Sequence, residues 1–198
     1  FSIASWCSSI GYPTGTSERE FITKANFDSL KSTFSGNTEL QLLAAVIEGD
    51  MSSSAQTAVT NYINALNTFQ NSGVIVFSAC NYSDEPDACL MAALPEYYSQ
   101  LGEAWLSVGW LEIEGTSISS STVSRKGNQC GSTKEYCVFG PGGNLNVAHH
   151  GGSDFYDANE NGSSYSAPMV SGIIALLAEA FPNHTPEQLV DRLLASSN

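Results

Sequence analysis

The residue best placed to do chemistry in this sequence is Ser164, in the stretch NGSSYSAPMVSG (161–172), which leads directly into the apolar run IIALLAEAF. A serine can act as a nucleophile when its hydroxyl projects into a cleft, lies close to hydrogen-bond donors and is held rigidly. The start of a buried helix offers such a place, because its first N–H groups are free and the positive end of its dipole faces outward. We therefore predict a helix over residues 164–181 that begins at Ser164, with Gly162 allowing close approach of a substrate backbone.

The small and apolar residues after Ser164 indicate how this helix would be held. Pro168 is expected near the first turn, where a missing N–H costs little. Val170, Ile173, Ile174 and Leu177 would bury the helix in the core. The pattern by itself leaves a second interpretation open, a serine-rich helix cap without chemistry, because serine is common at N-caps.

Composition bounds the kind of protein. The chain has 198 residues, of which 42% are hydrophobic and 14% charged, so it suits one domain or a large piece of one and is not expected to be disordered. The net charge of −13 argues against nucleic-acid binding, which needs clustered Lys and Arg. No apolar run reaches about 18 residues, the minimum for a membrane span.

The five cysteines indicate disulfides rather than a metal site. They form no CxxC pair, and the three histidines lie near no suitable cysteine pattern, so a zinc site is not expected. Disulfides in an exported protein fit better, although an odd number leaves at least one thiol without a partner in the chain. The cysteines are Cys7, Cys80, Cys89, Cys130 and Cys137.

The order of the expected elements predicts an α/β fold with a parallel sheet. The run VIVFSAC (74–80) has the length of a strand buried on both faces. Thr185 is a good N-cap, and Gln188 completes a capping box with it. The expected strands are residues 1–6, 74–80, 104–113 and 134–143, and the expected helices lie near 17–30, around 40–47, and at 53–73, 164–181 and 185–196.

The stretch around Ser164 closely resembles the nucleophile motif of the subtilisin-like serine proteases (subtilases), which reads Gly-Thr-Ser-x-small-small-Pro-x-aliphatic-small-Gly. The one departure is Ser163, where the family has threonine. The resemblance implies a subtilisin-like three-layer α/β domain with a mainly parallel sheet, here incomplete. It also implies a serine endopeptidase that acts on polypeptides, with Ser164 as its nucleophile. The matching positions are Gly162, Ser164, Ser166, Ala167, Pro168, Val170, Ser171 and Gly172.

A second match lies at NSGVIVFSACN (71–81), which resembles the buried strand that ends in Gly-Asn in this family. There the asparagine donates its side-chain amide to the oxyanion, so the resemblance gives Asn81 this role. Two simpler interpretations of Asn81 are a polar residue at a strand end and an N-glycosylation acceptor in the sequence NYS.

A third match, SIASWC (2–7), resembles the strand that runs beside the substrate. Ser5 and Trp6 would flank the primary specificity pocket. Cys7 and Cys80 stand where the family has glycines on the pocket floor, so with Gly162 these residues are expected to bind substrate. Because those glycines lie on neighbouring strands, the resemblance also makes a Cys7–Cys80 disulfide plausible.

Residues 94–109 and 128–145 look most like secreted bacterial subtilases, including autotransporter proteases. In that group the cysteines that correspond to Cys130 and Cys137 are bridged. Residues 12–50 look like an insertion, and Cys89 has no assigned partner.

The resemblance places the catalytic Asp and His outside this sequence. In subtilases both precede the strand that matches SIASW, and their Asp-Thr/Ser-Gly and His-Gly-Thr motifs do not occur here. We therefore expect the C-terminal part of a secreted or cell-surface peptidase domain, inactive alone, whose partner is an upstream segment carrying Asp and His. The alternative is an inactive subtilase-like binding or scaffold protein, which the two changes from glycine to cysteine favour.

The loop HHGGSDFYD (149–157) raises two further possibilities. His149 or His150, with Asp154 or Asp157, could serve Ser164 as a local base in a different hydrolase. The same loop has oxygen ligands suited to calcium, but it lacks the spacing of an EF-hand, so no cofactor is expected. These ligands are Asp154, Asp157, Asn159 and Glu160.

Overall fold

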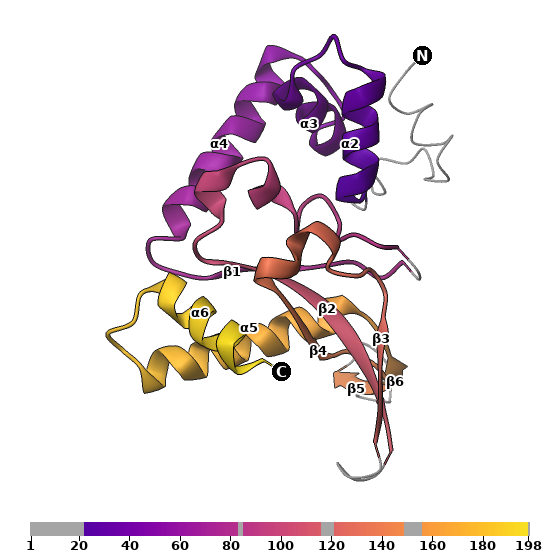
Figure 1. Ribbon diagram of the computed structural model, residues 1–198, viewed down its shortest axis with the longest axis vertical. Coiled ribbons are helices and arrows are strands. Elements are labelled where there is room, and N and C mark those ends of the chain that lie inside the picture. The colour runs from indigo at the N-terminus through magenta and orange to yellow at the C-terminus, as the bar shows by residue number, and fades with distance from the viewer. Residues whose placement is uncertain (1–21, 83–84, 116–120, 149–155, 198) are drawn as a thin grey trace.

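The computed structural model describes residues 22–82, 85–115, 121–148 and 156–197, and its elements form three layers (Figure 1). Three helices lie on one side of the central strands and two on the other. The first layer contains α2 (Lys24–Thr33), α3 (Glu39–Ile47) and α4 (Ser53–Phe69), and the opposite layer contains α5 (Ser163–Ala180) and α6 (Pro186–Ser196). The strand expected at residues 1–6 lies outside the described residues.

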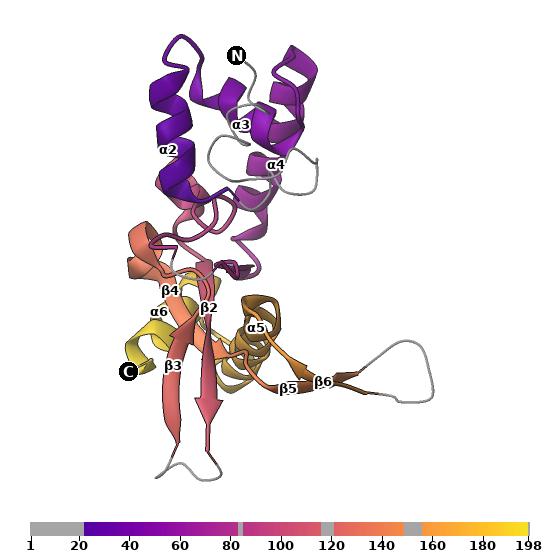
Figure 2. The ribbon, with the colours of Figure 1, turned by 90° about the vertical axis from the view of Figure 1, so that its right-hand side faces the viewer.

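The central sheet is mainly parallel, as predicted. Strand β2 pairs in parallel with β1 on one side and with β4 on the other, and it pairs antiparallel with β3 through its second half. A separate antiparallel pair, β5–β6, projects away from α5 (Figure 2). The strands are β1 (Ile75–Ser78), β2 (Trp105–Glu114), β3 (Thr122–Lys126), β4 (Cys137–Pro141), β5 (Leu145–Ala148) and β6 (Tyr156–Glu160).

Alternating side chains of β2 face the two helical layers. Trp105 is fully buried among residues of α2, α3 and α4, and its indole Nε1 donates to the Ala92 carbonyl at 3.0 Å. Leu106 and Val108 are also fully buried, but they pack with Val170 and other residues of α5 and α6. Since successive residues of a strand point to opposite faces, one strand joins both cores.

Most expected helices form close to their predicted bounds. Helix α6 has the predicted capping box, in which Thr185 Oγ1 accepts from Gln188 N and Gln188 Oε1 accepts from Thr185 N. Helix α4 ends at Phe69 rather than at residue 73, because the N–H groups of Ser72 and Gly73 both turn back to the Phe69 carbonyl.

Two expectations about element ends were wrong. Helix α5 begins at Ser163, so Pro168 lies inside the helix rather than in its first turn, and the ladder bond from residue 168 to the Ser164 carbonyl is missing. The strand expected at 134–143 begins at Cys137, because residues 131–136 form a 3-10 helix in which Thr133 Oγ1 donates to the Cys130 carbonyl.

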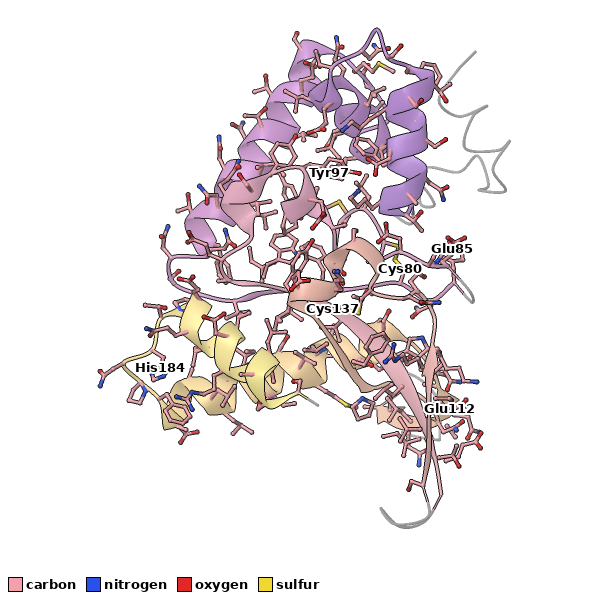
Figure 3. The ribbon with its side chains drawn as sticks, viewed as in Figure 1. Cys80, Glu85, Tyr97, Glu112, Cys137 and His184 are labelled. Carbon is pink, nitrogen blue, oxygen red and sulfur yellow. A yellow bond between two sulfur atoms is a disulfide. The ribbon has the colours of Figure 1, made fainter. Side chains whose placement is uncertain are left out.

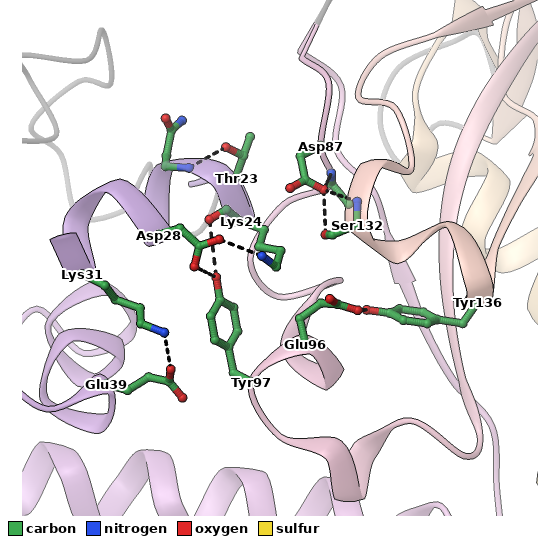
Figure 4. A network of polar contacts seen from close by, with 12 residues as sticks. Thr23, Lys24, Asp28, Lys31, Glu39, Asp87, Glu96, Tyr97, Ser132 and Tyr136 are labelled. Carbon is green, nitrogen blue, oxygen red and sulfur yellow. Dashed lines mark hydrogen bonds and ion pairs between the residues drawn. The ribbon is translucent and has the colours of Figure 1, made fainter.

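A polar network ties α2 to the chain that follows the Cys89 region (Figure 4). Tyr97 Oη donates to Asp28 Oδ1 at 2.8 Å, and Lys24 Nζ lies 2.7 Å from Asp28 Oδ2. Burial, together with the hydrogen bond to Asp28, raises the pKa of Tyr97 well above its ordinary value of 10.0. Partial burial opposes the charge on Asp28, but the hydrogen bonds from Lys24 and Tyr97 outweigh it and lower the pKa of Asp28.

Candidate active site

The turn before α5 brings Ser164 and Asn81 to the same place. Gly162 is the N-cap residue, with φ 147°, and a Cβ built there would lie 3.1 Å from Asn81 Nδ2 and 3.3 Å from Ser164 Oγ. A side chain at position 162 would therefore stand between these two groups. Ser164 and Asn81 are both exposed, whereas Gly162 is buried. The hydroxyl and the amide thus converge at a site open to an incoming ligand.

Ser163 fixes the orientation of the Asn81 side chain. Its N–H and its hydroxyl lie 2.7 Å and 2.8 Å from Asn81 Oδ1, and the Ser163 side chain is fully buried. A backbone N–H can only donate, so the atom facing it must be the amide oxygen rather than the nitrogen. The Asn81 amide nitrogen is left as a donor, and no acceptor among the described residues takes its protons.

The end of β4 holds the start of α5. Gly162 N donates to the Gly142 carbonyl at 2.7 Å, and Ser166 Oγ lies 3.0 Å from the carbonyls of both Gly140 and Pro141. Position 142 has no room for a side chain, since a Cβ there would lie 2.4 Å from Ser166 Oγ and 2.7 Å from the Gly162 carbonyl oxygen. Gly142 was not among the site residues expected from the sequence, although the turn signal GPGG marks its position.

The disulfides of the described residues differ from the expected ones in the partner of Cys80, and they show which cysteine pairs with Cys89. Cys80 is bridged to Cys89, with their Cα atoms 5.9 Å apart, so the expected Cys7–Cys80 bridge was wrong. Cys89 N donates to the Ala79 carbonyl at 3.2 Å, which brings the loop back beside the strand end and places the two sulfurs together. Cys130 and Cys137 are bridged, the pairing that the resemblance implied. Figure 3 shows Cys80 near Glu85, and Cys137 at the start of β4.

Several predicted site residues cannot be placed. Ser5, Trp6 and Cys7 lie outside the described residues, as do the candidate bases His149 and His150. For the calcium ligands suggested by the sequence, Asp154 is also outside, and the Asp157 side chain is not described. Of the other two, the Asn159 carbonyl accepts from Asn161 Nδ2 at 2.7 Å, and Glu160 Oε2 accepts from Tyr165 Oη at 2.9 Å. Within the described ranges, no three His, Cys, Asp or Glu side chains gather in an arrangement suited to a metal.

A hollow of about 540 Å³ lies along α6, and its lining residues belong to the α5–α6 connection and to α6 itself. Two of its polar groups contact each other, since Arg192 Nη2 lies 3.2 Å from His184 Nε2, and the Arg192 guanidinium carbon lies 3.9 Å from the centre of the Phe181 ring. None of its lining residues contacts Ser164 or Asn81, and we assign it no catalytic role.

A serine at the mouth of a core helix, beside an oriented amide donor at the end of a parallel strand, defines a serine-hydrolase type of site on an α/β scaffold. Comparison with known proteins makes the class specific, because residues 6–198 match the Subtilase family. The chain belongs to this family of serine peptidases. The match includes residues 12–50, and the expectation that they form an insertion remains a prediction.

Two curated relatives are bacterial proteins much longer than this chain. Serotype-specific antigen 1 of Mannheimia haemolytica is 27% identical over 140 residues, which is 68% of this chain and 14% of that protein. An extracellular serine protease of Serratia marcescens is 29% identical over 135 residues, which is 59% of this chain and 12% of that protein. The chain therefore spans about one-seventh or less of these relatives.

Two solved structures support the fold. The prenylagaramide maturation protease PagA has a TM-score of 0.50 and 21% identity, with 70% of this chain and 46% of that chain covered. Sphericase has a TM-score of 0.50 and 19% identity, with 78% of this chain and 52% of that chain covered. The chain matches about half the length of each of these two proteins.

Proposed function

We propose that this chain supplies the nucleophile and the oxyanion donor of a serine endopeptidase. The observation that carries the proposal is the convergence of Ser164 Oγ and Asn81 Nδ2 on the space above Gly162. In the proposed reaction, Ser164 Oγ attacks the carbonyl carbon of a peptide bond, and the carbonyl oxygen becomes an oxyanion. The Asn81 amide then donates to that oxygen, where it stabilises the transition state more than the bound substrate.

The backbone at the start of α5 supports the same role. The N–H of Ser164 lies in the first turn, where no intrahelical acceptor is available, and no acceptor among the described residues takes it. Together with the Asn81 amide it can face an oxyanion, and the helix dipole favours negative charge there. The proposed groups all belong to the protein, so this chemistry needs no cofactor.

The general base and its orienting carboxylate are proposed to come from an upstream segment that carries the family's Asp and His. Ser164 alone is a weak nucleophile, because nothing described beside it can take its proton. The histidine would accept that proton and pass it to the leaving amine, and the aspartate would hold the imidazole in the required tautomer. The 198-residue chain by itself is therefore expected to be inactive.

Two surfaces fit the docking of that segment. Among the described residues no strand pairs with the outer edge of β1, so its N–H and C=O groups are open to another strand. On α5, the exposed fractions of Met169, Ile173 and Leu176 are 40%, 43% and 67%, and their spacing puts them on one face. Such an apolar face is typical of a surface that another part of a protein covers.

We propose that the substrate is a polypeptide and that one of its side chains enters a pocket of this protein. The residues expected to line the pocket are Ser5, Trp6, Cys7, Cys80 and Gly162. The Cys80 side chain is bonded to Cys89, so its sulfur is directed to the loop. The change from glycine to cysteine at position 80 is therefore compatible with an open pocket. The change at position 80 therefore no longer argues for the alternative function, an inactive subtilase-like binding protein. That function stays the alternative.

We also propose that the protein works outside the cytoplasm, at the cell surface or in the medium. Two disulfides in a chain of this size are typical of proteins that fold in an oxidising compartment. One curated relative bears the name extracellular serine protease. In the described part of the chain, no helix is long and apolar enough to cross a membrane.

Fluorophosphonate labelling and peptide hydrolysis test the proposal. The complete protein, including the segment before Phe1, should hydrolyse peptides and label at Ser164, and Ser164→Ala should abolish both. The 198-residue chain alone should do neither until the upstream segment is added. A complete protein that folds but neither labels nor cleaves would replace the proposal with the inactive alternative.

A further inference from the structure

Asn81 lies beyond the part of β1 that the sheet holds in place. The last ladder bond joins Ala79 N to the Val108 carbonyl at 2.8 Å, two residues before Asn81. Its side chain is fixed at one end by Ser163, but Asn81 itself is exposed. Other contacts must therefore hold the backbone that carries this side chain.

One buried residue, Asn128, binds the backbone on both sides of Asn81. Its N–H donates to the Cys80 carbonyl at 3.2 Å, and its Oδ1 accepts from Tyr82 N at 2.8 Å. Its Nδ2 donates to the Asp87 carbonyl at 2.8 Å, and the residue is fully buried. Because Tyr82 N can only donate and the Asp87 carbonyl can only accept, the orientation of the Asn128 amide is fixed.

The Cys80–Cys89 loop completes this attachment. Cys80 has φ 84°, a left-handed conformation that is unfavourable for a residue other than glycine and needs support from its surroundings. The disulfide to Cys89 constrains the same residue from its side chain. At the far side of the loop, Asp87 Oδ1 accepts from both the N–H and the hydroxyl of Ser132, at 2.9 and 2.8 Å (Figure 4).

We infer that Asn128 is a positioning residue for the oxyanion donor: it clamps the peptides before and after Asn81 and so aims the Asn81 amide. The inference rests on the proposed function. Asn128 touches neither substrate nor Ser164, and its effect on the reaction passes through Asn81. Without the Asn128 side chain, the backbone would keep its bond at Ala79 and the bond from Asn128 N to the Cys80 carbonyl. The peptide after Asn81 would lose its acceptor at Asn128 Oδ1, and with it the fixed direction of Asn81.

The expected effect is large because transition-state donors act only at short range. A displacement of about 1 Å can lower a rate by about 10²-fold, and loss of an oxyanion donor costs about 10²–10³-fold in a subtilisin, a member of this family. Asn128→Ala should therefore lower kcat by about 10–100-fold. KM should stay within about twofold, because the donor contributes little to binding of the ground state.

A double-mutant cycle in the complete protein tests the inference. The variants are Asn128→Ala, Asn81→Ala and the pair, with kcat and KM measured for a peptide substrate. If Asn128 acts through Asn81, its substitution should change kcat by less than about threefold once Asn81 is alanine. Should Asn128→Ala not fold, Asn128→Leu takes its place, because it keeps the volume of the side chain but removes both the acceptor for Tyr82 N and the donor to the Asp87 carbonyl. The same dependence on Asn81 is expected for Asn128→Leu.

Gln70 provides a matched control. It is also a buried amide that joins two backbone groups, since its Nε2 donates to the Gln100 carbonyl at 2.9 Å and its Oε1 accepts from Ala104 N at 3.2 Å. Gln70→Ala should lower thermal stability about as much as Asn128→Ala and leave kcat near the wild-type value.

Three results would overturn the inference. An undiminished effect of Asn128→Ala in the Asn81→Ala background would mean that Asn128 does not act through Asn81. An equal loss of kcat in Gln70→Ala would mean that general destabilisation explains it. A wild-type protein that shows neither labelling nor hydrolysis would overturn the proposed function, and this inference with it. An active wild type in which the effects of Asn128→Ala and Asn81→Ala on kcat are additive would overturn the inference alone.

Discussion

Gly142 offers a direct test of how the end of β4 positions Ser164, the proposed nucleophile. In Gly142→Ala the new Cβ would lie 2.4 Å from Ser166 Oγ, 2.6 Å from Trp110 Cβ and 2.7 Å from the Gly162 carbonyl oxygen. Ordinary van der Waals contact begins near 3.4 Å. Several atoms must therefore move apart, and two of the three neighbours, Ser166 and Gly162, flank Ser164.

The cost can be estimated from these contacts. Overpacking of a closely packed site costs about 1–3 kcal/mol of stability. Gly142 also accepts the hydrogen bond from Gly162 N at 2.7 Å, so its displacement moves the turn that carries Ser164. If Ser164 shifts by about 1 Å, kcat should fall by about 10²-fold.

The assay compares the complete protein with Gly142→Ala and with a control, Gly36→Ala. A Cβ at Gly36 would meet nothing within 4 Å, so this variant should keep full activity and stability. Peptide hydrolysis gives kcat, the rate of fluorophosphonate labelling reports on Ser164, and thermal unfolding reports on stability. A Gly142→Ala variant with kcat within about twofold of wild type would refute the idea that this contact sets the position of Ser164.

Two further variants test contacts on the two sides of the sheet. Ser163→Ala keeps the N–H bond to Asn81, the proposed oxyanion donor, but removes the hydroxyl bond at 2.8 Å, so kcat should fall by about 3–30-fold. Ser163→Thr keeps a hydroxyl and should retain activity. An unchanged kcat in Ser163→Ala would show that the N–H suffices. Tyr97→Phe tests the ionisation of a half-buried phenol. Folding raises the pKa of Tyr97 above its ordinary value of 10.0. The resulting contribution to stability is fully present below pH 10.0. It is lost as the pH rises above that value, because the tyrosine then ionises more readily in the unfolded chain than in the folded protein. Urea unfolding of the complete protein between pH 9 and about 11 should show a shallower loss of stability in Tyr97→Phe than in wild type, and identical slopes would contradict this account.

The sequence predicted those features that depend on neighbouring residues. The fold class followed from the order of apolar runs and helical patterns. The capping box of Thr185 and Gln188 needs side chains only three residues apart, and it formed as predicted. The motifs around Ser164 and Asn81 were also recognisable locally, because each is a short turn with a specific residue order.

Other expectations failed where a contact between distant residues decided the outcome. The pairing of Cys80 could not be read from spacing, and the prediction chose Cys7 instead of Cys89. The strand expected from residue 134 starts at Cys137, because the segment before it is held by the disulfide and by Thr133. Ser163 was noted only as a departure from a family pattern, although it orients the amide of Asn81.

The sequence by itself determined the chemical groups of this protein: a hydroxyl at the start of an apolar helix and an amide at the end of a buried strand. These depend on residue type and local order, which a linear chain already contains. Only the tertiary structure decided which groups meet, such as Ser163 with Asn81 across 82 residues and Asn128 with Tyr82 across 46. The reason is physical, since hydrogen bonds need partners placed to within a few tenths of an ångström, and here the pairing of β1, β2 and β4 sets those positions.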